Sequence, residues 1–515
     1  MAPTQGLLRP HDKNEKFGTK TRLPDTYNPL YSYRLPRGET KQYLQQYGDM
    51  YFLRLAKLKP VVEKIAEADW EDFEIAGEHA QRVDRVLDVR QGQLCWVVGT
   101  VYLDMALKPN ILEDISREHW IAGPPPRKSY FSQDGETQIM LEDESGRLRL
   151  SGAMLKNTLL VTGVIIAVLG TENANGDFDV LDIHIPELPR QPNRGERDEE
   201  EDEESKMDLD NQPRKKIALV SGLNISGTSA DTLQLSLLSE FLLGESLDTI
   251  DQESSAQITR LVIAGNSIAA DAIISNASNQ QSDKATSTHH ANKKYGYDAS
   301  SYNPIPTQLL DAFLSELLPT VPITIMSGEQ DPANTSLPQQ PIHPAIFPHS
   351  RAYSSTTTIT SLDTIPTSNT QPGWFDSVTN PWDGDISGWR FMGNSGQPVD
   401  DILKYVDLGG PDGSGADGRL EVMESMLRWR CGAPTAPDTL HCYPFQERDQ
   451  FVIDACPHVF FVGNQPRFDT AVIDGPGGQT VRLVAVPSFS VTGELVLVDA
   501  ETLEVEVVRF DVDDG

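Results

Sequence analysis

Residues 323–331 read Ile-Thr-Ile-Met-Ser-Gly-Glu-Gln-Asp, an apolar run of strand length that ends on glycine and three polar residues. Four other apolar runs end in a similar way, at Ser221-Gly222-Leu223, Gly265-Asn266, Gly393-Asn394 and Gly463-Asn464-Gln465-Pro466. Helical spacing of apolar residues lies between several of these runs, over 232–243, 306–318 and 418–429. We therefore expect an α/β sandwich domain over residues 215–515, with a layered sheet, helices outside it and polar side chains at the strand ends.

A second unit is expected over residues 82–190. The two units together would place the whole chain in the α+β class. Short apolar runs alternate in the second unit with turn residues, at 94–102, 138–141, 148–150, 160–169 and 178–183. Five such strands predict a small Greek-key barrel of the OB type. OB barrels bind single strands by stacking bases on aromatic side chains. The candidates are Trp96, Tyr102 and Phe178, but basic residues do not cluster near them in the sequence, so a structural role is favoured and direct binding of single-stranded DNA stays an alternative.

The remaining segments flank or interrupt these two domains. Residues 1–37 are expected to be an extended N-terminal segment, and residues 38–81 a helical region with one apolar face. That face carries Tyr43, Tyr47, Tyr51, Leu55, Leu58 and Val62. Residues 191–214 form an acidic linker, predicted to be disordered, and polar insertions near 275–301, 351–370 and 409–418 interrupt the last domain.

Charge and composition exclude several classes of protein. The net charge of -33 opposes broad contact with phosphate backbones, although part of it lies in one acidic run, 196–204. The sequence has no apolar stretch long enough for a membrane helix and no apolar core of a signal peptide, so we expect a soluble intracellular protein without membrane contact. None of the four cysteines stands in a C-x-x-C pair, which disfavours a zinc or redox site. The basic group Pro213-Arg214-Lys215-Lys216 is either a nuclear-import signal or the flank of a strand.

The order and spacing of the strand ends resemble those of the calcineurin-like metallophosphoesterases, whose strand ends supply carboxylates and histidines to two metal ions. This sequence has Ser221 and Leu223 in place of Asp-x-His, and Asn266 in place of the Gly-Asp acid. It has Glu329, Gln330 and Asp331 in place of Asn-His-Asp, and Asn464 and Pro466 in place of the last two histidines. Asparagine and serine cannot replace imidazole or carboxylate in a dinuclear site. We expect a degenerate former metal site with no catalytic residues, no metal and no cofactor; an active metal-dependent phosphodiesterase or nuclease is the alternative.

This loss of ligands resembles the B-subunit family of eukaryotic replicative DNA polymerases, and within it the small subunits of the delta enzyme of fungal type. The motifs that carry the resemblance are Tyr33-Arg34-Leu35-Pro36-Arg37-Gly38-Glu39, Leu141-Glu142-Asp143-Glu144, Leu160-Val161-Thr162-Gly163, Gly328-Glu329-Gln330-Asp331-Pro332, Leu337-Pro338-Gln339-Gln340-Pro341, Gly393-Asn394-Ser395-Gly396-Gln397, Thr435-Ala436-Pro437-Asp438-Thr439-Leu440 and Cys456-Pro457-His458-Val459. The B-subunits of polymerases alpha and epsilon remain alternatives within the family.

The resemblance implies an OB domain packed against an inactive calcineurin-like phosphoesterase domain, in a nuclear complex. It implies a non-catalytic scaffold that joins the C-terminal metal-cysteine domain of a polymerase catalytic subunit to a third subunit. Contact with DNA and with the sliding clamp would then be indirect. No residue can be assigned to either partner from a motif, although Trp374, Trp382 and Trp389 are either anchors for a partner or core residues.

Overall fold

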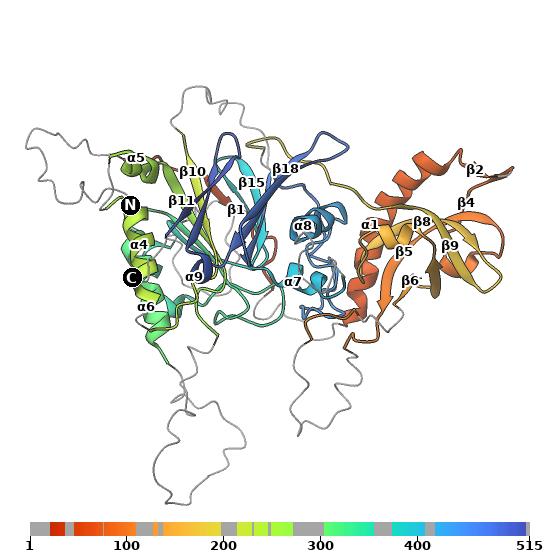
Figure 1. Cartoon of the computed structure of the whole chain (residues 1–515), viewed down its shortest axis with the longest axis horizontal. Coiled ribbons are helices and arrows are strands. Elements are labelled where there is room, and N and C mark those ends of the chain that lie inside the picture. The colour runs from red at the N-terminus through yellow and green to blue at the C-terminus, as the bar shows by residue number, and fades with distance from the viewer. Residues whose placement is uncertain are drawn as a thin grey trace, which may run out of the picture.

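The computed structural model describes residues 21–36, 46–75, 77–109, 127–131, 137–196, 214–228, 231–245, 249–270, 303–354, 373–406 and 418–510. These residues form a small β-barrel at one end of an elongated molecule and a larger β-sandwich with helices on both outer faces at the other (Figure 1). Most of the acidic linker, the bulk of the three polar insertions, and the residues Tyr43, Gly38, Glu39 and Pro213 lie outside the described residues.

The barrel is one sheet with the strand order β4-β5-β6-β7-β9-β8, closed by a further pairing of β5 with β8. Its strands are β4 (Gln81–Arg82), β5 (Leu94–Asp104), β6 (Gln138–Glu142), β7 (Arg147–Ser151), β8 (Ile165–Glu172) and β9 (Asp177–His184). The 3-10 helix η2 (Val86–Asp88) precedes β5, and the short helix α3 (Met154–Asn157) lies between β7 and β8. Each of the five runs expected here contains a strand, but the strand in 160–169 begins only at Ile165 because Val161 to Gly163 form a turn.

Helix α1 (Tyr47–Trp70) packs along the barrel, and the hairpin of β2 (Glu74–Ile75) and β3 (Glu78–His79) follows it. Leu55, Leu58 and Val62 of the expected apolar face are buried against the barrel. The prediction was wrong for Tyr47, whose side chain is 52% exposed. The inward positions of the first turns are taken instead by Met50 and Arg54, so the buried face is rotated away from Tyr47.

Two six-stranded sheets make the sandwich. The first has the order β1-β14-β15-β16-β18-β17, and the second the order β13-β12-β11-β10-β19-β20. The strands of the first are β1 (Tyr27–Pro29), β14 (Trp382–Ile386), β15 (Trp389–Asn394), β16 (Val459–Gln465), β17 (Asp469–Asp474) and β18 (Thr480–Pro487). Those of the second are β10 (Lys216–Val220), β11 (Ile258–Ala264), β12 (Ile323–Met326), β13 (Phe375–Val378), β19 (Glu494–Asp499) and β20 (Val505–Arg509).

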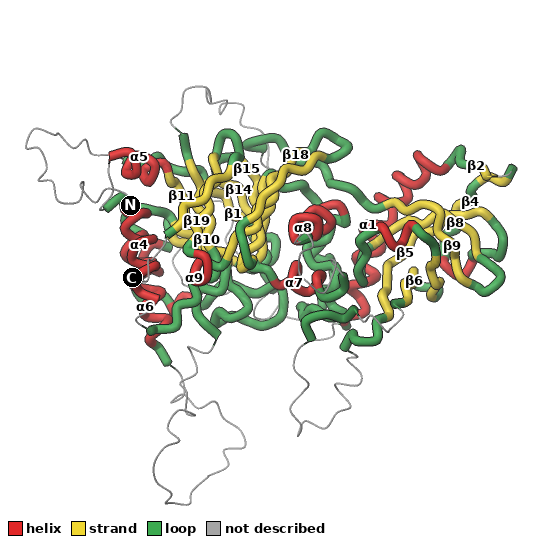
Figure 2. Tube along the Cα trace, viewed as in Figure 1, coloured by secondary structure: helices red, strands yellow, loops and turns green. Residues whose placement is uncertain are grey.

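The sheets face each other across one apolar core, to which both contribute buried valine side chains and the first sheet adds Trp382, Phe391 and Phe461. Helices α4 (Asp231–Leu243), α5 (Thr249–Gln257) and α6 (Ile305–Leu317) lie on the outer side of the second sheet, with η5 (Pro344–Ile346) and η6 (Ser350–Tyr353) beside α6. Helices α7 (Gln397–Leu403) and α8 (Arg419–Arg428) cover the first sheet and lie between it and the barrel (Figure 2). The short helix α9 (Phe489–Thr492) connects β18 to β19.

Residues 21–36 form an N-terminal strap that crosses the sandwich. At one end, the Arg22 guanidinium donates hydrogen bonds to the carbonyls of Ser255 (2.6 Å) and Ile258 (2.8 Å). In the middle, β1 adds an edge strand to β14, and the Tyr27 hydroxyl donates to Asp376 at 2.6 Å. The strap therefore contacts both sheets and the outer helices with its own backbone and side chains.

Candidate functional site

The ends of four parallel strands bring most of the expected former metal-site residues together. The backbone N–H of Asn464 donates to the Ser221 hydroxyl at 2.8 Å, and the N–H of Gln330 donates to the Asn266 side-chain oxygen at 3.1 Å. Three of the expected residues do not join this cluster. Leu223 is buried in the apolar core under the helices, whereas Glu329 and Pro466 are exposed.

Ser221 and Asp331 are committed to contacts within the chain. The Ser221 hydroxyl is fully buried and donates towards the carbonyls of Pro487 (2.9 Å) and Val486 (3.1 Å). The Asp331 carboxylate accepts from the backbone N–H groups of Ile268 (3.0 Å) and Gly328 (2.9 Å). Burial raises the pKa of Asp331 to about 6, against the opposing effect of those backbone hydrogen bonds. Within the described residues, no group of three or more His, Cys, Asp or Glu side chains is placed to hold a metal ion.

An amide cluster of Gln339, Asn380, Ser395 and Gln397 lies next to these strand ends, and the sequence did not single it out as a unit. The Asn380 amide donates to the side-chain oxygens of Gln339 (2.8 Å) and Gln397 (3.0 Å). The Gln339 amide in turn donates to the carbonyl of Gly328 at 3.0 Å. Asn380 and Gln339 are at most 1% exposed. This buried network therefore fixes the turn after β12 through the bond from Gln339 to Gly328. Gln339 and Gln397 stand in two of the motifs that carry the family resemblance, but nothing in those motifs indicated that the two side chains would meet.

The strand ends pack in direct contact with one another. A Cβ atom at Gly463 would lie 2.4 Å from the carbonyl oxygen of Ala264, and one at Gly265 would lie 2.5 Å from the Cβ of Ser395. Asn266 and Asn464 follow these glycines with positive φ angles of 49° and 57°. Asparagine tolerates this left-handed conformation better than most side chains. The asparagines at these two strand ends therefore also suit the tight turns at which they stand.

Arg54 of α1 joins the barrel side of the molecule to the sandwich side. Its guanidinium forms a buried ion pair with Asp449 at 2.8 Å, and both side chains are 1% exposed. The remaining N–H groups donate to backbone carbonyls, among them Pro434 (2.7 Å), Ala436 (3.0 Å) and Gly163 (3.3 Å). A buried charge whose hydrogen bonds are all used fixes the position of the elements that supply the acceptors.

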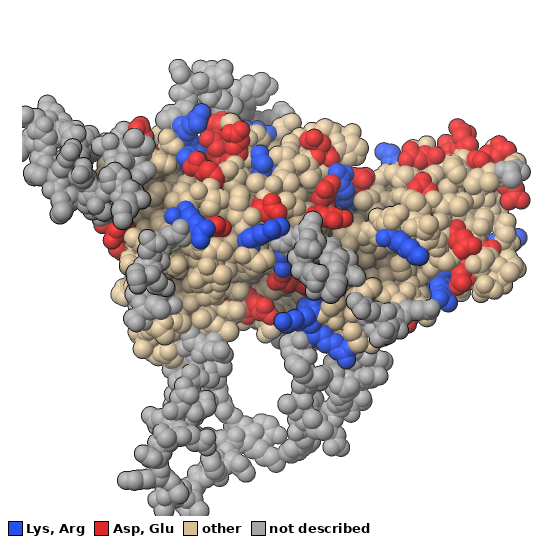
Figure 3. All heavy atoms as spheres, viewed as in Figure 1, with Lys and Arg blue, Asp and Glu red and all other residues tan. Residues whose placement is uncertain are grey.

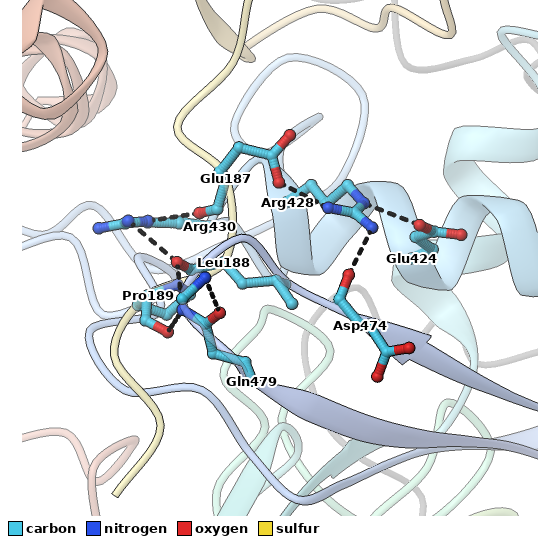
Figure 4. A network of polar contacts seen from close by, with 9 residues as sticks. Glu187, Leu188, Pro189, Glu424, Arg428, Arg430, Asp474 and Gln479 are labelled. Atoms are coloured by element: carbon cyan, nitrogen blue, oxygen red, sulfur yellow. Dashed lines mark hydrogen bonds and ion pairs between the residues drawn. The ribbon is translucent and has the colours of Figure 1, made fainter. Parts of the chain in front are cut away.

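The connector, residues 185–196, leads from β9 to the sandwich and is held by a second polar network (Figure 4). Arg428 of α8 pairs with Glu187 at 2.6 Å and with Glu424 at 2.7 Å. Arg430 donates to the backbone carbonyls of Glu187 (2.6 Å) and Leu188 (3.2 Å). Figure 4 shows these side chains converging on the connector from the side of α8, so the start of the connector is fixed to the sandwich.

The aromatic residues expected as base-stacking candidates are poorly placed for that role. Trp96 is 3% exposed and Phe178 is fully buried. Tyr102 is half-buried, and the ammonium of Lys108 lies 4.1 Å from its ring centre. The end of the barrel around β2 carries exposed acidic side chains, visible as the red group at the upper right of Figure 3. They are Glu71, Asp72, Glu74 and Glu78.

The three tryptophans expected as anchors or core residues differ in exposure. Trp382 is 2% exposed and belongs to the core between the sheets. Trp389 is half-buried and donates its ring N–H to the carbonyl of Ala500 at 2.5 Å. Trp374 is 48% exposed.

The described helices include none that is long and apolar enough to cross a membrane.

Comparison with known proteins relates both parts of the chain to polymerase subunits. A family model for the B-subunit of DNA polymerases alpha and epsilon matches residues 217–470. One described as the DNA polymerase delta subunit OB-fold domain matches residues 46–183, a range that includes α1.

Whole-length relatives agree with these matches. The chain is 35% identical to the DNA polymerase delta small subunit of Saccharomyces cerevisiae, over 96% of this chain and 95% of that protein. It is 36% identical to the protein of the same name from Arabidopsis thaliana, over 90% of this chain and 91% of that protein. It is 33% identical to DNA polymerase delta subunit 2 of Drosophila melanogaster, over 96% and 99%.

Proposed function

The chain belongs to the family of DNA polymerase delta small subunits, and from this membership we propose that it is the non-catalytic scaffold of that polymerase, acting in replication and repair synthesis. The observation that carries the proposal is the similarity over nearly the full length of chains that bear this name, through both the barrel and the sandwich. Fold alone would not assign a function, because both architectures serve many activities.

We propose that the sandwich is a calcineurin-like phosphoesterase domain that has lost its chemistry. Two features support this. The side chains at the strand ends are hydroxyls and amides that bond to one another and to the backbone. The one carboxylate among them that is buried, Asp331, accepts from backbone N–H groups on two sides. A two-metal hydrolase needs several carboxylate and imidazole ligands around a shared space. The alternative, an active phosphodiesterase or nuclease, would have to bind metal largely through groups that are already hydrogen-bonded; the buried side-chain oxygen of Asn464 is an exception.

The proposed partners are the C-terminal metal-cysteine domain of the catalytic subunit and the third subunit of the same polymerase. The rigid junction supports a bridging role, since Arg54 and the connector network fix the barrel and the sandwich to each other. A bridge that holds its two ends in one geometry can present both partner surfaces at a constant distance. Trp374, as an exposed aromatic side chain on the sandwich, suits an anchor for one of them.

A direct single-strand binding role for the barrel is the less favoured alternative. Two of the three candidate stacking residues, Trp96 and Phe178, are core residues. The exposed acidic group around β2 would repel a phosphate backbone. Nuclear localisation is proposed from the replication role rather than from the basic group, because Lys216 begins β10 and pairs with Glu506.

One purified sample tests the scaffold proposal. Metal content and manganese-dependent hydrolysis of a phosphodiester should both be absent, and the chain should capture the catalytic subunit's C-terminal domain stably. An Asp331→Asn variant serves as the comparison for hydrolysis. Stoichiometric metal together with turnover that this variant abolishes would refute the non-catalytic assignment, and failure to capture the catalytic domain would refute the bridging role.

A further inference from the structure

One flank of α1, beside its barrel-packing face, forms one wall of a groove. The groove has a volume of about 600 Å³ and is lined by Pro60, Val61, Lys64, Ile65, Ala68, Asp69 and Arg430. Its apolar members Val61, Ile65 and Ala68 recur on one side of the helix at spacings of four and three residues, and Pro60 lies beside Val61. Val61 and Ile65 are half-buried, whereas Pro60 and Ala68 are exposed, so the face has no covering element within the described chain.

Two cationic side chains, Lys64 and Arg430, and one carboxylate, Asp69, line this apolar floor, in a chain whose net charge is -33. Lys64 is exposed and makes no ion pair within the residues that the structure describes. Arg430 closes the opposite wall, and it is held there in a left-handed backbone conformation, with a φ angle of 52°. A non-glycine residue in this conformation is strained and persists only where its surroundings hold it. Here, the contacts of Arg430 with the connector carbonyls fix it.

A second concave region continues from Arg430, with a volume of about 1020 Å³. Arg190, Arg194, Trp389 and His458 are among its lining residues. Both Arg190 and Arg194 are paired with carboxylates, Glu196 and Glu501, so this region is less positive than its arginines alone would make it. Lys64 and the apolar residues of α1 line the first groove and not this second region.

We propose that the groove between α1 and Arg430 docks an amphipathic helix of a partner protein, with apolar side chains entering the groove and acidic side chains on its flanks. Pro60 and Ala68 are eight positions apart, or about 12 Å at 1.5 Å per residue, which matches about two turns of a partner helix. Acidic flanks of the partner would meet Lys64 and Arg430.

A helix fits these features better than a nucleic acid does. Single strands are held by stacking on exposed aromatic rings and by a continuous basic track. This groove has an aliphatic floor, and Asp69 stands at its end. The proposal goes beyond the bridging role, because it depends on the chemistry of the partner segment and not on which protein supplies it.

The test uses the full chain and a synthetic helical peptide with leucine at the spacings i, i+3, i+4 and i+7 and glutamate on both flanks, labelled for fluorescence anisotropy. The same peptide with lysine in place of glutamate, and an oligothymidine strand, are the comparison ligands. The variants are Ile65→Glu and Lys64→Glu. Phe52→Glu is the matched control, because Phe52 is an exposed apolar residue of the same helix, 55% exposed, outside the groove lining.

We expect the acidic peptide to bind, and each groove variant to weaken binding at least about tenfold, or about 1.4 kcal/mol. Phe52→Glu should leave the affinity unchanged, and the lysine peptide should bind more weakly. Lys64→Glu changes an exposed side chain, so it tests the groove even if Ile65→Glu impairs folding. Absence of binding, equal binding of the lysine peptide, equal loss in Phe52→Glu, or binding of oligothymidine but not peptide through Lys64 would each overturn the proposal.

Discussion

Replacing Arg54 by methionine should destabilise the protein more than any change of similar size on the surface of α1. Methionine keeps much of the side-chain volume but removes the charge. The Asp449 carboxylate, 1% exposed, would keep only its hydrogen bond from the backbone N–H of Phe451 at 2.9 Å. The carbonyls of Pro434 and Ala436 would lose their donor.

Removing one partner of a buried ion pair costs about 3–5 kcal/mol, because the other charge stays buried without compensation. The control lies three residues further along the same helix. Lys57 pairs with Asp454 at 3.0 Å, but the two side chains are 56% and 40% exposed. An exposed pair of this kind contributes about 0–1 kcal/mol, so Lys57→Met should have little effect.

Urea unfolding of the full chain, followed by tryptophan fluorescence, measures the difference as the shift in midpoint multiplied by the slope m. The double variant Arg54→Met/Asp449→Leu should cost less than the sum of the two single changes, by about 1 kcal/mol or more, because it removes both charges together. If Arg54→Met shifts the midpoint no further than Lys57→Met, then the ion pair does not hold the junction and the rigidity argued above has another source.

Three further changes test other parts of the structure. Gly463→Ala should cost about 1–3 kcal/mol through the clash at the strand end, whereas Gly48→Ala, with no atom within 4 Å of the added Cβ, should be neutral or slightly stabilising in thermal unfolding. Burial holds the pKa of His458 at about 4, below the unfolded value of about 6.5, so folding stability is lost as the pH falls from about 6.5 towards 4. His458→Gln should flatten that part of a curve of unfolding free energy against pH. An unchanged slope would contradict this prediction. Trp382→Ala should lower the free energy of unfolding by about 3–5 kcal/mol, because this ring is buried. Trp374→Ala should leave that free energy nearly unchanged and, if the exposed ring is an anchor, weaken capture of a polymerase partner. Equal unfolding midpoints for the two variants would be inconsistent with the burial of the two side chains.

The sequence predicted the strand ends of β10, β11 and β12 well because these strands are buried on both faces. Each ends in a run of buried apolar residues, at Val220, Ala264 and Met326, just before the strand-end residues expected from the sequence. β14 was missed because its two aspartates alternate with buried residues, one of which is a glycine. Both aspartates bond to the strap, Asp383 to Ser32 at 2.7 Å and Asp385 to Asn28 at 3.4 Å, and their partners lie about 350 positions away in the sequence.

The same limit applies to the site. Residue types at the strand ends could be read from the sequence, because parallel strands end at one edge. The inward turn of Arg54 could not, since a charged residue on an amphipathic helix is normally placed on the solvent side. Its acceptor, Asp449, is separated from it by 395 residues. Periodicity describes one element at a time and does not reveal a partner on another domain.

The strap has a consequence for how the chain is made. Tyr27 and Ser32 bond to Asp376 and Asp383, which are 349 and 351 residues further along. At a synthesis rate of about 5–20 residues per second, these acceptors leave the ribosome roughly 20–70 seconds after the strap. The barrel strands are synthesised during that interval, whereas β14, the strand with which β1 pairs, has not yet been made. An early-synthesised segment of this protein is thereby among the last to reach its final place.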